Sequence, residues 1–141
     1  GEEKEKDPGF LKGRRIMLVE DNELNREIAY ELLSESGLIV DVAENGQEAI
    51  KLLGTRPENY YELIFMDIQM PVMNGYEATA NIRAGKSDYW KNIPVIAMTA
   101  NVFQEDESRA AECGMSDYVT KPIDMNVIYS VLEKWLRGQK G

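Results

Sequence analysis

Five residues whose side chains could do chemistry each stand at the end of a short apolar run: Glu20, Asp21, Asp67, Thr99 and Lys121. A carboxylate can attack phosphorus as a nucleophile, and several carboxylates together can hold a divalent cation. A hydroxyl and an ammonium can stabilise the charge on phosphoryl oxygens. This combination of residue types points to metal-assisted phosphoryl transfer, provided that the fold brings the five together.

The composition excludes several other chemistries. The 141 residues include 16 Lys and Arg, 25 Asp and Glu, one Cys and no His, which gives a formal net charge of −9. The lack of His excludes Ser-His-Asp catalysis, the usual zinc sites and a phosphohistidine on this chain. The single cysteine, Cys113, rules out an intramolecular disulfide and suits a reducing cytoplasm.

The charge balance also bears on partners and location. An acidic chain repels a phosphate backbone, so we expect no direct binding to nucleic acid. No apolar run approaches the ~20 residues of a spanning helix, and the N-terminus lacks the apolar core of a signal peptide. We therefore expect a soluble, cytoplasmic protein that does not insert into a membrane. Its 43% apolar residues suffice for the core of one domain.

Short apolar runs alternate with segments of helical period from residue 14 to residue 137, which we expect to form the folded domain. Strands are predicted at 16–19, 38–43, 63–66, 94–98 and 117–120. Helices are predicted at 22–36, 45–53, 74–83 and 104–113, and after Asp124, which caps the last one. Residues 1–13 begin with Gly rather than Met, are rich in charge and contain Pro8 and Gly9. They are typical of a flexible leader on an excised or processed domain, and 138–141 of a C-terminal tail.

Three local details accompany these elements. The first predicted helix carries one apolar stripe, which consists of Leu24, Ile28 and Leu32. Ala29 and Leu33 flank this stripe. Gly37 is expected to end this helix, and Gly54 to end the second. Residues 84–92 are expected to form a long connection that packs locally over the sheet edge.

Five strands alternating with five helices predict a parallel sheet covered on both faces, which is a three-layer α/β sandwich. Ligands of such sheets bind beyond the carboxyl ends of the strands, near the point where strand order reverses. If the order is 2-1-3-4-5, then Glu20, Asp21 and Asp67 converge at that point. Two carboxylates ~4 Å apart repel by roughly 4 kcal/mol at an effective dielectric of ~20, so cations must offset them. Lys121 supplies one charge, and we expect Mg²⁺, with Mn²⁺ as the alternative, to supply the rest.

Four motifs then carry a family resemblance: Glu20-Asp21-Asn22, the run MDIQMPVMNG at 66–75, Met98-Thr99-Ala100, and YVTKP at 118–122. In these motifs the chain resembles the receiver domain of two-component response regulators, over about 120 of its 141 residues. It is especially similar to receivers attached to hybrid sensor histidine kinases. The resemblance implies a flavodoxin-like (βα)5 three-layer sandwich with a five-stranded parallel sheet in the order 2-1-3-4-5.

The resemblance also implies a role for each matching residue. Asp67 is the expected phosphoryl acceptor. Glu20 and Asp21 are the expected ligands of Mg²⁺, together with Asp67 and the main-chain carbonyl of Gln69. In this reading the chain catalyses its own phosphorylation and dephosphorylation and has no separate catalytic domain.

Other residues are expected to assist or respond. Thr99 and Lys121 would bind the phosphoryl oxygens, and the Lys121–Pro122 peptide bond would be cis. Movement of Thr99 would let Tyr118 turn inward and remodel the face formed by the helix at 104–113, the strand at 117–120 and the last helix. Gln69 and Asn101 would tune the lifetime of the phosphoryl group.

The function implied is a receiver that takes a phosphoryl group from a phosphohistidine on a histidine kinase or a histidine phosphotransfer domain. As part of a hybrid kinase, it would be the cytoplasmic portion of a membrane-bound protein. The chain has no room for a DNA-binding effector, so we expect the output to lie elsewhere, and a homodimer remains open.

Three alternatives use different chemistry. A degenerate receiver would bind partners without phosphate, but its five site residues would not need to be intact. A phosphatase of the haloacid dehalogenase type would need a second Asp two residues after the nucleophile, where Gln69 stands. A flavodoxin-like FMN binder would need a phosphate-cradling loop after the first strand, where Glu20 and Asp21 would repel the phosphate.

Overall fold

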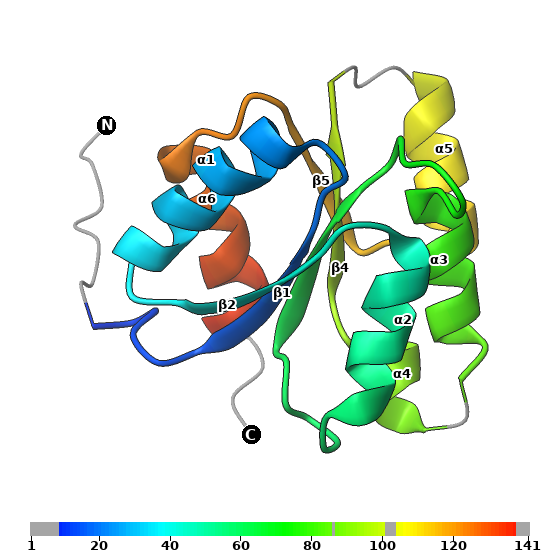
Figure 1. Ribbon diagram of the computed structural model, residues 1–141, viewed down its shortest axis with the longest axis horizontal. Coiled ribbons are helices and arrows are strands. Elements are labelled where there is room, and N and C mark those ends of the chain that lie inside the picture. Colours follow the sequence, from blue (N-terminus) through cyan, green and yellow to red (C-terminus); the bar gives the residue numbers. More distant parts are fainter. Residues whose placement is uncertain (1–8, 86, 101–103, 138–141) are drawn as a thin grey trace.

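The predicted sheet is present, with the predicted strand order. A computed structural model describes residues 9–85, 87–100 and 104–137. Its five strands are all parallel and lie in the order β2-β1-β3-β4-β5 (Figure 1). Their bounds are β1 Arg15–Val19, β2 Ile39–Ala43, β3 Leu63–Asp67, β4 Val95–Thr99 and β5 Asp117–Thr120.

Helices cover both faces of this sheet and make the three layers. They are α1 Glu23–Glu35, α2 Gly46–Thr55, α3 Gly75–Arg83, α4 Asp88–Asn92, α5 Gln104–Cys113 and α6 Met125–Leu132, followed by a π-helical turn, η1, at Glu133–Arg137. Helices α1 and α6 lie on one face, and α2, α3 and α5 on the other (Figure 1). Among the described residues, none of the helices has both the length and the apolar character that crossing a bilayer requires.

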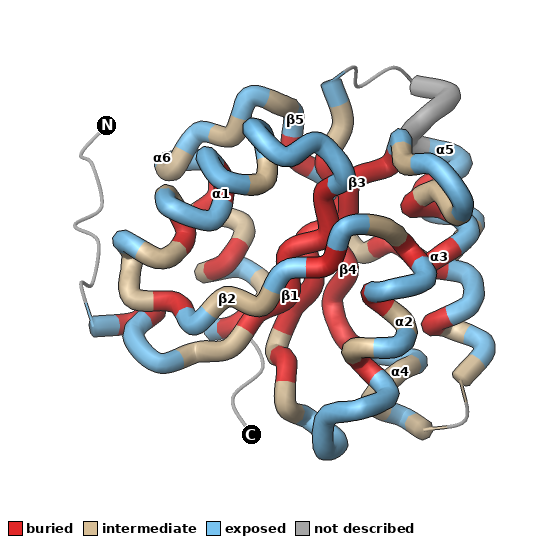
Figure 2. The backbone as a smooth tube through the Cα atoms, viewed as in Figure 1, coloured by how far each residue is buried: buried red, intermediate tan, exposed pale blue. Residues whose placement is uncertain are grey.

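The core is divided in two by the sheet. Strand β1 alternates, because Ile16 and Leu18 pack in the layer of α1 and α6, whereas Met17 and Val19 pack in the layer of α2 and α3. Residues of β1, β3 and β4 are almost completely buried, as the red centre of Figure 2 shows. A strand covered on both faces must be apolar on both, which explains why these runs read as continuous in the sequence.

The strand order reverses at β1, which pairs with β2 on one side and β3 on the other. The chain leaves β1 toward α1 on one face, and leaves β3 toward α3 on the opposite face. The two connections therefore diverge and leave a depression beyond the carboxyl ends of β1 and β3. That depression is where the sequence places its acidic residues.

Two boundaries in the α2 and α4 region differ from the prediction. The connection at 84–92 contains the short helix α4, whose N-cap Ser87 accepts a hydrogen bond from the Trp90 amide at 3.1 Å. Helix α2 does not end at Gly54 but continues to Thr55, and Pro57 follows shortly afterwards. Gly37, by contrast, ends α1 as predicted and has a φ of +100°.

The packed part of the chain begins earlier than the expected boundary at residue 14. Phe10 and Leu11 are buried against the layer of α1 and α6. The guanidinium groups of Arg14 and Arg137 lie 4.6 and 4.1 Å from the centre of the Phe10 ring. Residues 1–8 and 138–141, expected to be the rest of the leader and the tail, lie outside the described residues.

Candidate functional site

The loop after β1 delivers two carboxylates. The main-chain N–H of Glu20 donates to the carbonyl of Ala43 at 3.0 Å, which extends the pairing of β1 with β2 by one residue. Asn22 then caps α1, because its side chain accepts from the Asn25 amide at 2.9 Å. The Asn22 amide donates to the carboxylate of Glu20 at 3.1 Å. Glu20 is thereby fixed and buried, whereas Asp21 is exposed at the mouth of the depression.

The loop after β3 delivers the third carboxylate, Asp67, which is the last residue of its strand and is buried. Helix α3 starts with a capping box between Asn74 and Glu77, so its first turn is well defined. Gly75, the first residue of α3, lies so close to β3 that an added Cβ would collide with the main-chain carbonyl oxygen of Asp67. Glycine is therefore required for the close approach of α3 to the residue at the centre of the site.

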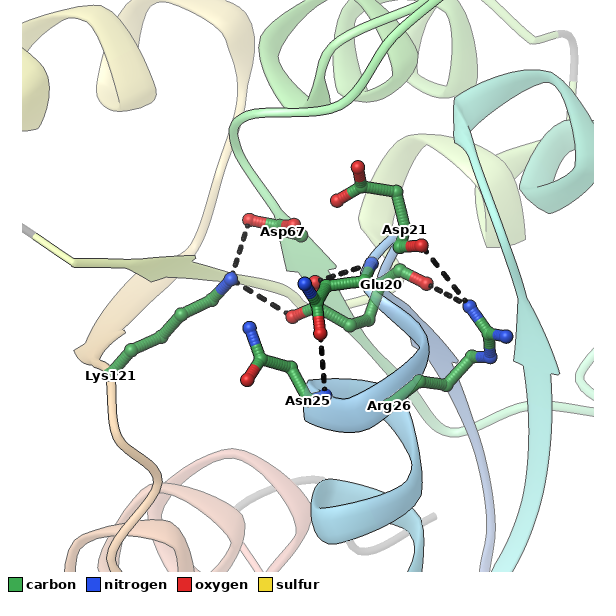
Figure 3. Close-up of polar contacts among 7 residues, drawn as sticks. Glu20, Asp21, Asn25, Arg26, Asp67 and Lys121 are labelled. Carbon is green, nitrogen blue, oxygen red and sulfur yellow. Dashed lines mark hydrogen bonds and ion pairs between the residues drawn. The ribbon is translucent and has the colours of Figure 1, made fainter.

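Lys121 links the two loops from the end of β5. Its Nζ atom lies 2.9 Å from an oxygen of Glu20 and 3.0 Å from an oxygen of Asp67 (Figure 3). The Lys121–Pro122 peptide bond is cis, as the family resemblance implied. Three carboxylates thus face one ammonium, and the cluster keeps an excess of negative charge.

This charge distribution appears in the pKa values of the buried groups. Burial, followed by the nearby Glu20 carboxylate, raises the pKa of Asp67 to about 7, although Lys121 acts in the opposite direction. Burial opposes the charge of Lys121, but its bonds to Glu20 and Asp67 prevail, and its pKa is raised. One ammonium therefore does not satisfy the cluster.

The donor set fits a divalent metal ion. Glu20, Asp21 and Asp67 each offer an oxygen, and the three oxygens lie within 4.8 Å of one another. Hard oxygen donors on two adjacent loops suit Mg²⁺, which keeps some of its coordination positions open for water or a substrate. The chain therefore has the residues to bind such an ion.

The pocket around these carboxylates also contains the remaining expected participants. It has a volume of about 160 Å³, and its lining includes Gln69, Thr99 and Lys121 besides the three acidic residues. Tyr118 does not line this pocket; it lies in β5 with 39% of its surface exposed. Asn101, the other residue expected to tune phosphoryl lifetime, lies outside the described residues.

An apolar surface beside the pocket was not predicted. Leu24 and Ile28 belong to the stripe predicted on the first helix, but Ala29 and Leu33 make the buried face instead. Leu24 is 64% exposed and Ile28 50% exposed. We call these two residues the α1 patch. The stripe and its flanking positions together contain more apolar residues than a single buried face requires, which is the sequence signal for this surface.

A groove connects the α1 patch to the carboxylates. Its volume is about 350 Å³, and its lining includes Ile28 and Asn25 from α1 and Pro122 and Ile123 from the segment after β5. Glu20 and Lys121 line its inner end. A protein that docks on α1 would therefore lie next to the buried acid.

Comparison with known proteins agrees with this geometry. The family model for the response regulator receiver domain matches residues 16–133. Hybrid signal transduction histidine kinase L of Dictyostelium discoideum is 35% identical over 141 residues, covering 99% of this chain. Histidine kinase 3 of Arabidopsis thaliana is 36% identical over 147 residues, covering 92% of this chain. The chain spans only 8% and 14% of the lengths of these two relatives.

Solved receiver domains share the fold at similar identity. The receiver domain of a Pseudomonas aeruginosa sensor histidine kinase, solved with a magnesium ion in its active-site cleft, is 35% identical with a TM-score of 0.77. That alignment covers 87% of this chain and 97% of the other. The receiver domain of yeast Ssk1, solved in complex with the histidine phosphotransfer protein Ypd1, is 30% identical with a TM-score of 0.80. The alignment with Ssk1 covers 92% of each chain.

Proposed function

Because this chain belongs to the response regulator receiver family, we propose that it accepts a phosphoryl group on Asp67 in a reaction that depends on Mg²⁺. The donor is a phosphohistidine on a histidine kinase or a histidine phosphotransfer protein, and the setting is the cytoplasmic portion of a hybrid kinase. The observation that carries the proposal is the burial of Asp67 beside Glu20, Asp21 and Lys121.

The chemistry follows from these neighbours. A carboxylate oxygen of Asp67 forms the new bond to phosphorus while the bond from phosphorus to the histidine nitrogen breaks. Lys121 and Thr99 line the same pocket, where the ammonium and the hydroxyl would stabilise charge on the transferring oxygens. Glu20, Asp21, Asp67 and the carbonyl of Gln69 would hold Mg²⁺, which neutralises negative charge on the phosphoryl group when bound.

The signal follows from the charge that is added. A phosphoryl group adds about −1.5 to −2 charge at one point of the molecule. Thr99 moves toward this charge, Tyr118 turns inward from its exposed position, and the surface of α5, β5 and α6 changes. The change is a shift between existing conformations, limited by how much better one of them accommodates the phosphoryl group.

The α1 patch and the groove beside it are the docking surface for the donor in this proposal. Their support is position, because exposed Ile28 lines the groove whose other end is formed by Lys121 and Glu20. Leu24, the other residue of the patch, is exposed on the same helix. The yeast Ssk1 receiver binds a phosphotransfer protein of the same functional class, Ypd1. A small phosphodonor needs no such surface.

The central test incubates the protein with phosphoramidate in the presence of Mg²⁺. Intact-protein mass spectrometry then measures whether a phosphoryl group has been added. We expect one added phosphoryl group in the wild type and none in Asp67→Asn, whereas Asp88→Asn, on exposed α4, keeps uptake. No uptake by the wild type would favour a binding module that works without phosphate. Continuous turnover of unrelated phosphate esters would favour a phosphatase.

Docking is tested separately with phosphorylated Ypd1 as donor. We expect Ile28→Ala to slow transfer from this protein severalfold and to leave uptake from phosphoramidate unchanged. Tyr30→Ala is the matched control, because Tyr30 is exposed on the same helix but does not line the groove that contains Glu20 and Lys121. It lines a second groove, toward β2, which Ile28 also borders. Equal slowing by both variants, or slowing of phosphoramidate uptake by Ile28→Ala, would contradict docking at the patch.

A further inference from the structure

Arg26 holds the acidic loop from the side opposite Lys121. Its guanidinium donates to the main-chain carbonyl of Glu20 at 3.0 Å and to that of Asp21 at 3.4 Å. Figure 3 shows the two cations on either side of the loop, with Lys121 bound to side-chain oxygens and Arg26 to main-chain oxygens. Arg26 thus binds the main-chain carbonyls of both acidic residues in the loop after β1.

Arg26 bonds to main-chain carbonyls although several carboxylates lie near it in the sequence. Acidic residues surround Arg26 in the sequence at Asp21, Glu23 and Glu27. Within the described part of the chain, however, Arg26 forms no ion pair with a carboxylate. It is also partly buried, unlike most of its neighbours on the first turns of α1. Its side chain is therefore committed to the two carbonyl groups.

The position of Arg26 is electrostatically unfavourable for the helix itself. It lies four residues after the N-cap Asn22, and the positive end of a helix dipole repels a cation there. A residue that breaks a local rule points to a compensating role, and the loop contacts are the ones the structure shows.

Those contacts complete the restraint of the loop. The Glu20 amide is bound by Ala43, and the Glu20 carboxylate accepts from the Asn22 amide. The carbonyls of Glu20 and Asp21 are the groups that Arg26 adds. With both peptide planes fixed, the carboxylates of Glu20 and Asp21 keep their direction toward Asp67.

We propose that Arg26 is a positioning residue that aligns Glu20 and Asp21 for cation binding. The inference rests on the proposed metal site. Partners behind metal ligands orient them, and their loss commonly weakens metal binding by about 10- to 100-fold. Arg26 does so through the backbone, without contact to the ion or to the phosphoryl group.

The direction in which Mg²⁺ affinity changes when Arg26 is removed distinguishes a positioning role from an effect of its charge alone. Arg26 is a cation near an acidic cluster, so if it acted only through its charge, its removal would tighten Mg²⁺ binding. If it positions the loop, its removal weakens binding despite the lost repulsion. A role in stability alone would leave the affinity of the folded protein unchanged.

The first experiment measures Mg²⁺ affinity by isothermal titration calorimetry in the wild type, Arg26→Ala and Arg26→Lys. We expect the dissociation constant to rise about tenfold in Arg26→Ala. A smaller rise is expected in Arg26→Lys, because the two bonds of Arg26 come from one nitrogen and an ammonium can also donate to main-chain carbonyls. Lys51→Gln, on the exposed side of α2, removes the same charge elsewhere and should leave the constant unchanged. Unchanged or tighter binding in Arg26→Ala overturns the inference.

The second experiment works without metal. In the presence of a chelator, NMR amide exchange at Asn22 reports whether the loop is held, because this amide donates to Glu20. We expect severalfold faster exchange in Arg26→Ala and little change in Lys51→Gln, with α1 remaining folded by circular dichroism. Equal exchange in all proteins contradicts the inference. If the wild type binds no Mg²⁺, the proposed function fails, and the exchange result still decides the role of Arg26.

Discussion

Asp67 is buried between Glu20 and Lys121 in surroundings that disfavour its ionised form. In the folded protein the pKa of Asp67 is about 7, so its carboxyl group stays protonated until the pH approaches that value. In the unfolded chain the same group has a pKa of 3.8. Stability associated with this proton is complete below the unfolded pKa and is lost as pH rises through the folded pKa. The residue placed for chemistry is therefore a stability cost at neutral pH.

Asp67→Asn should reveal this cost as a stability gain that depends on pH. With a chelator present, we expect the variant to match the wild type near pH 4 and to be about 1–2 kcal/mol more stable above pH 7, because Lys121 still pairs with Glu20. Urea denaturation across this pH range provides the measurement, and Asp88→Asn, on exposed α4, is the control. A gain that is constant with pH would contradict the assignment to Asp67.

The same proton should compete with the metal. Since Mg²⁺ requires ionised ligands, binding must release the proton from Asp67 when the pH lies below its folded pKa. We expect the apparent dissociation constant to be steady above pH 8 and to rise by nearly tenfold per pH unit well below pH 7. Calorimetry in buffers of different ionisation enthalpy would count the released proton. If no proton is released on Mg²⁺ binding at pH 6, the prediction is contradicted.

At the scale of elements, the loop between β3 and α3 contains a strained turn close to the site. The Met73 amide donates to the Pro71 carbonyl at 2.7 Å, which makes a three-residue turn with Val72 at its centre. Val72 has a φ of +69°, in the region that favours glycine, and it is 76% exposed. A β-branched residue there costs energy that no burial offsets.

Val72→Gly should relieve this strain. We expect a net gain of about 0.5–1 kcal/mol, because about 1–2 kcal/mol of backbone strain outweighs the added entropy of glycine in the unfolded chain. The melting temperature should rise by about 2 °C in calorimetry. Val72→Ala keeps a Cβ at positive φ and should gain nothing. If Ala and Gly variants are equally stable, the turn is not strained.

At the scale of the whole molecule, the first and last packed segments meet. Phe10 lies beside Arg137 of the turn η1, and its ring contacts Tyr129 of α6 edge-on with centroids 6.2 Å apart. Arg14 bonds to the Phe10 carbonyl at 2.8 Å and to Glu62 at 2.7 Å. Residues ahead of β1 thus belong to the layer of α1 and α6.

Phe10→Ala should therefore destabilise the protein. We expect a loss of about 2–3 kcal/mol in urea denaturation, somewhat below the usual 3–5 kcal/mol for core phenylalanines because the ring is at the rim. Lys12→Ala, two residues further on and exposed, should change stability by less than about 0.5 kcal/mol. A Phe10→Ala variant as stable as the wild type would show that the segment does not support the fold.

The sequence alone determined the fold class and the residues that follow the apolar runs, and its resemblance to the receiver family implied the strand order that brings them together. Strands covered on both faces read as plain apolar runs, and the residue after such a run must lie at the sheet edge. The same logic, with the four motifs, indicated the receiver family before any coordinates. Buried Glu20 and Asp67 were therefore found from their place in the chain.

Only the tertiary structure decided which apolar residues are covered and what restrains the loops. Periodicity counts the apolar residues of a helix but does not show which side meets the sheet, so it grouped Leu24 and Ile28 in one stripe without showing that they are exposed. Phe10 has no periodic neighbours, and its burial depends on α6, more than a hundred residues away in the chain. The bonds of Arg26 go to main-chain carbonyls, which carry no residue identity, so no sequence motif could report them.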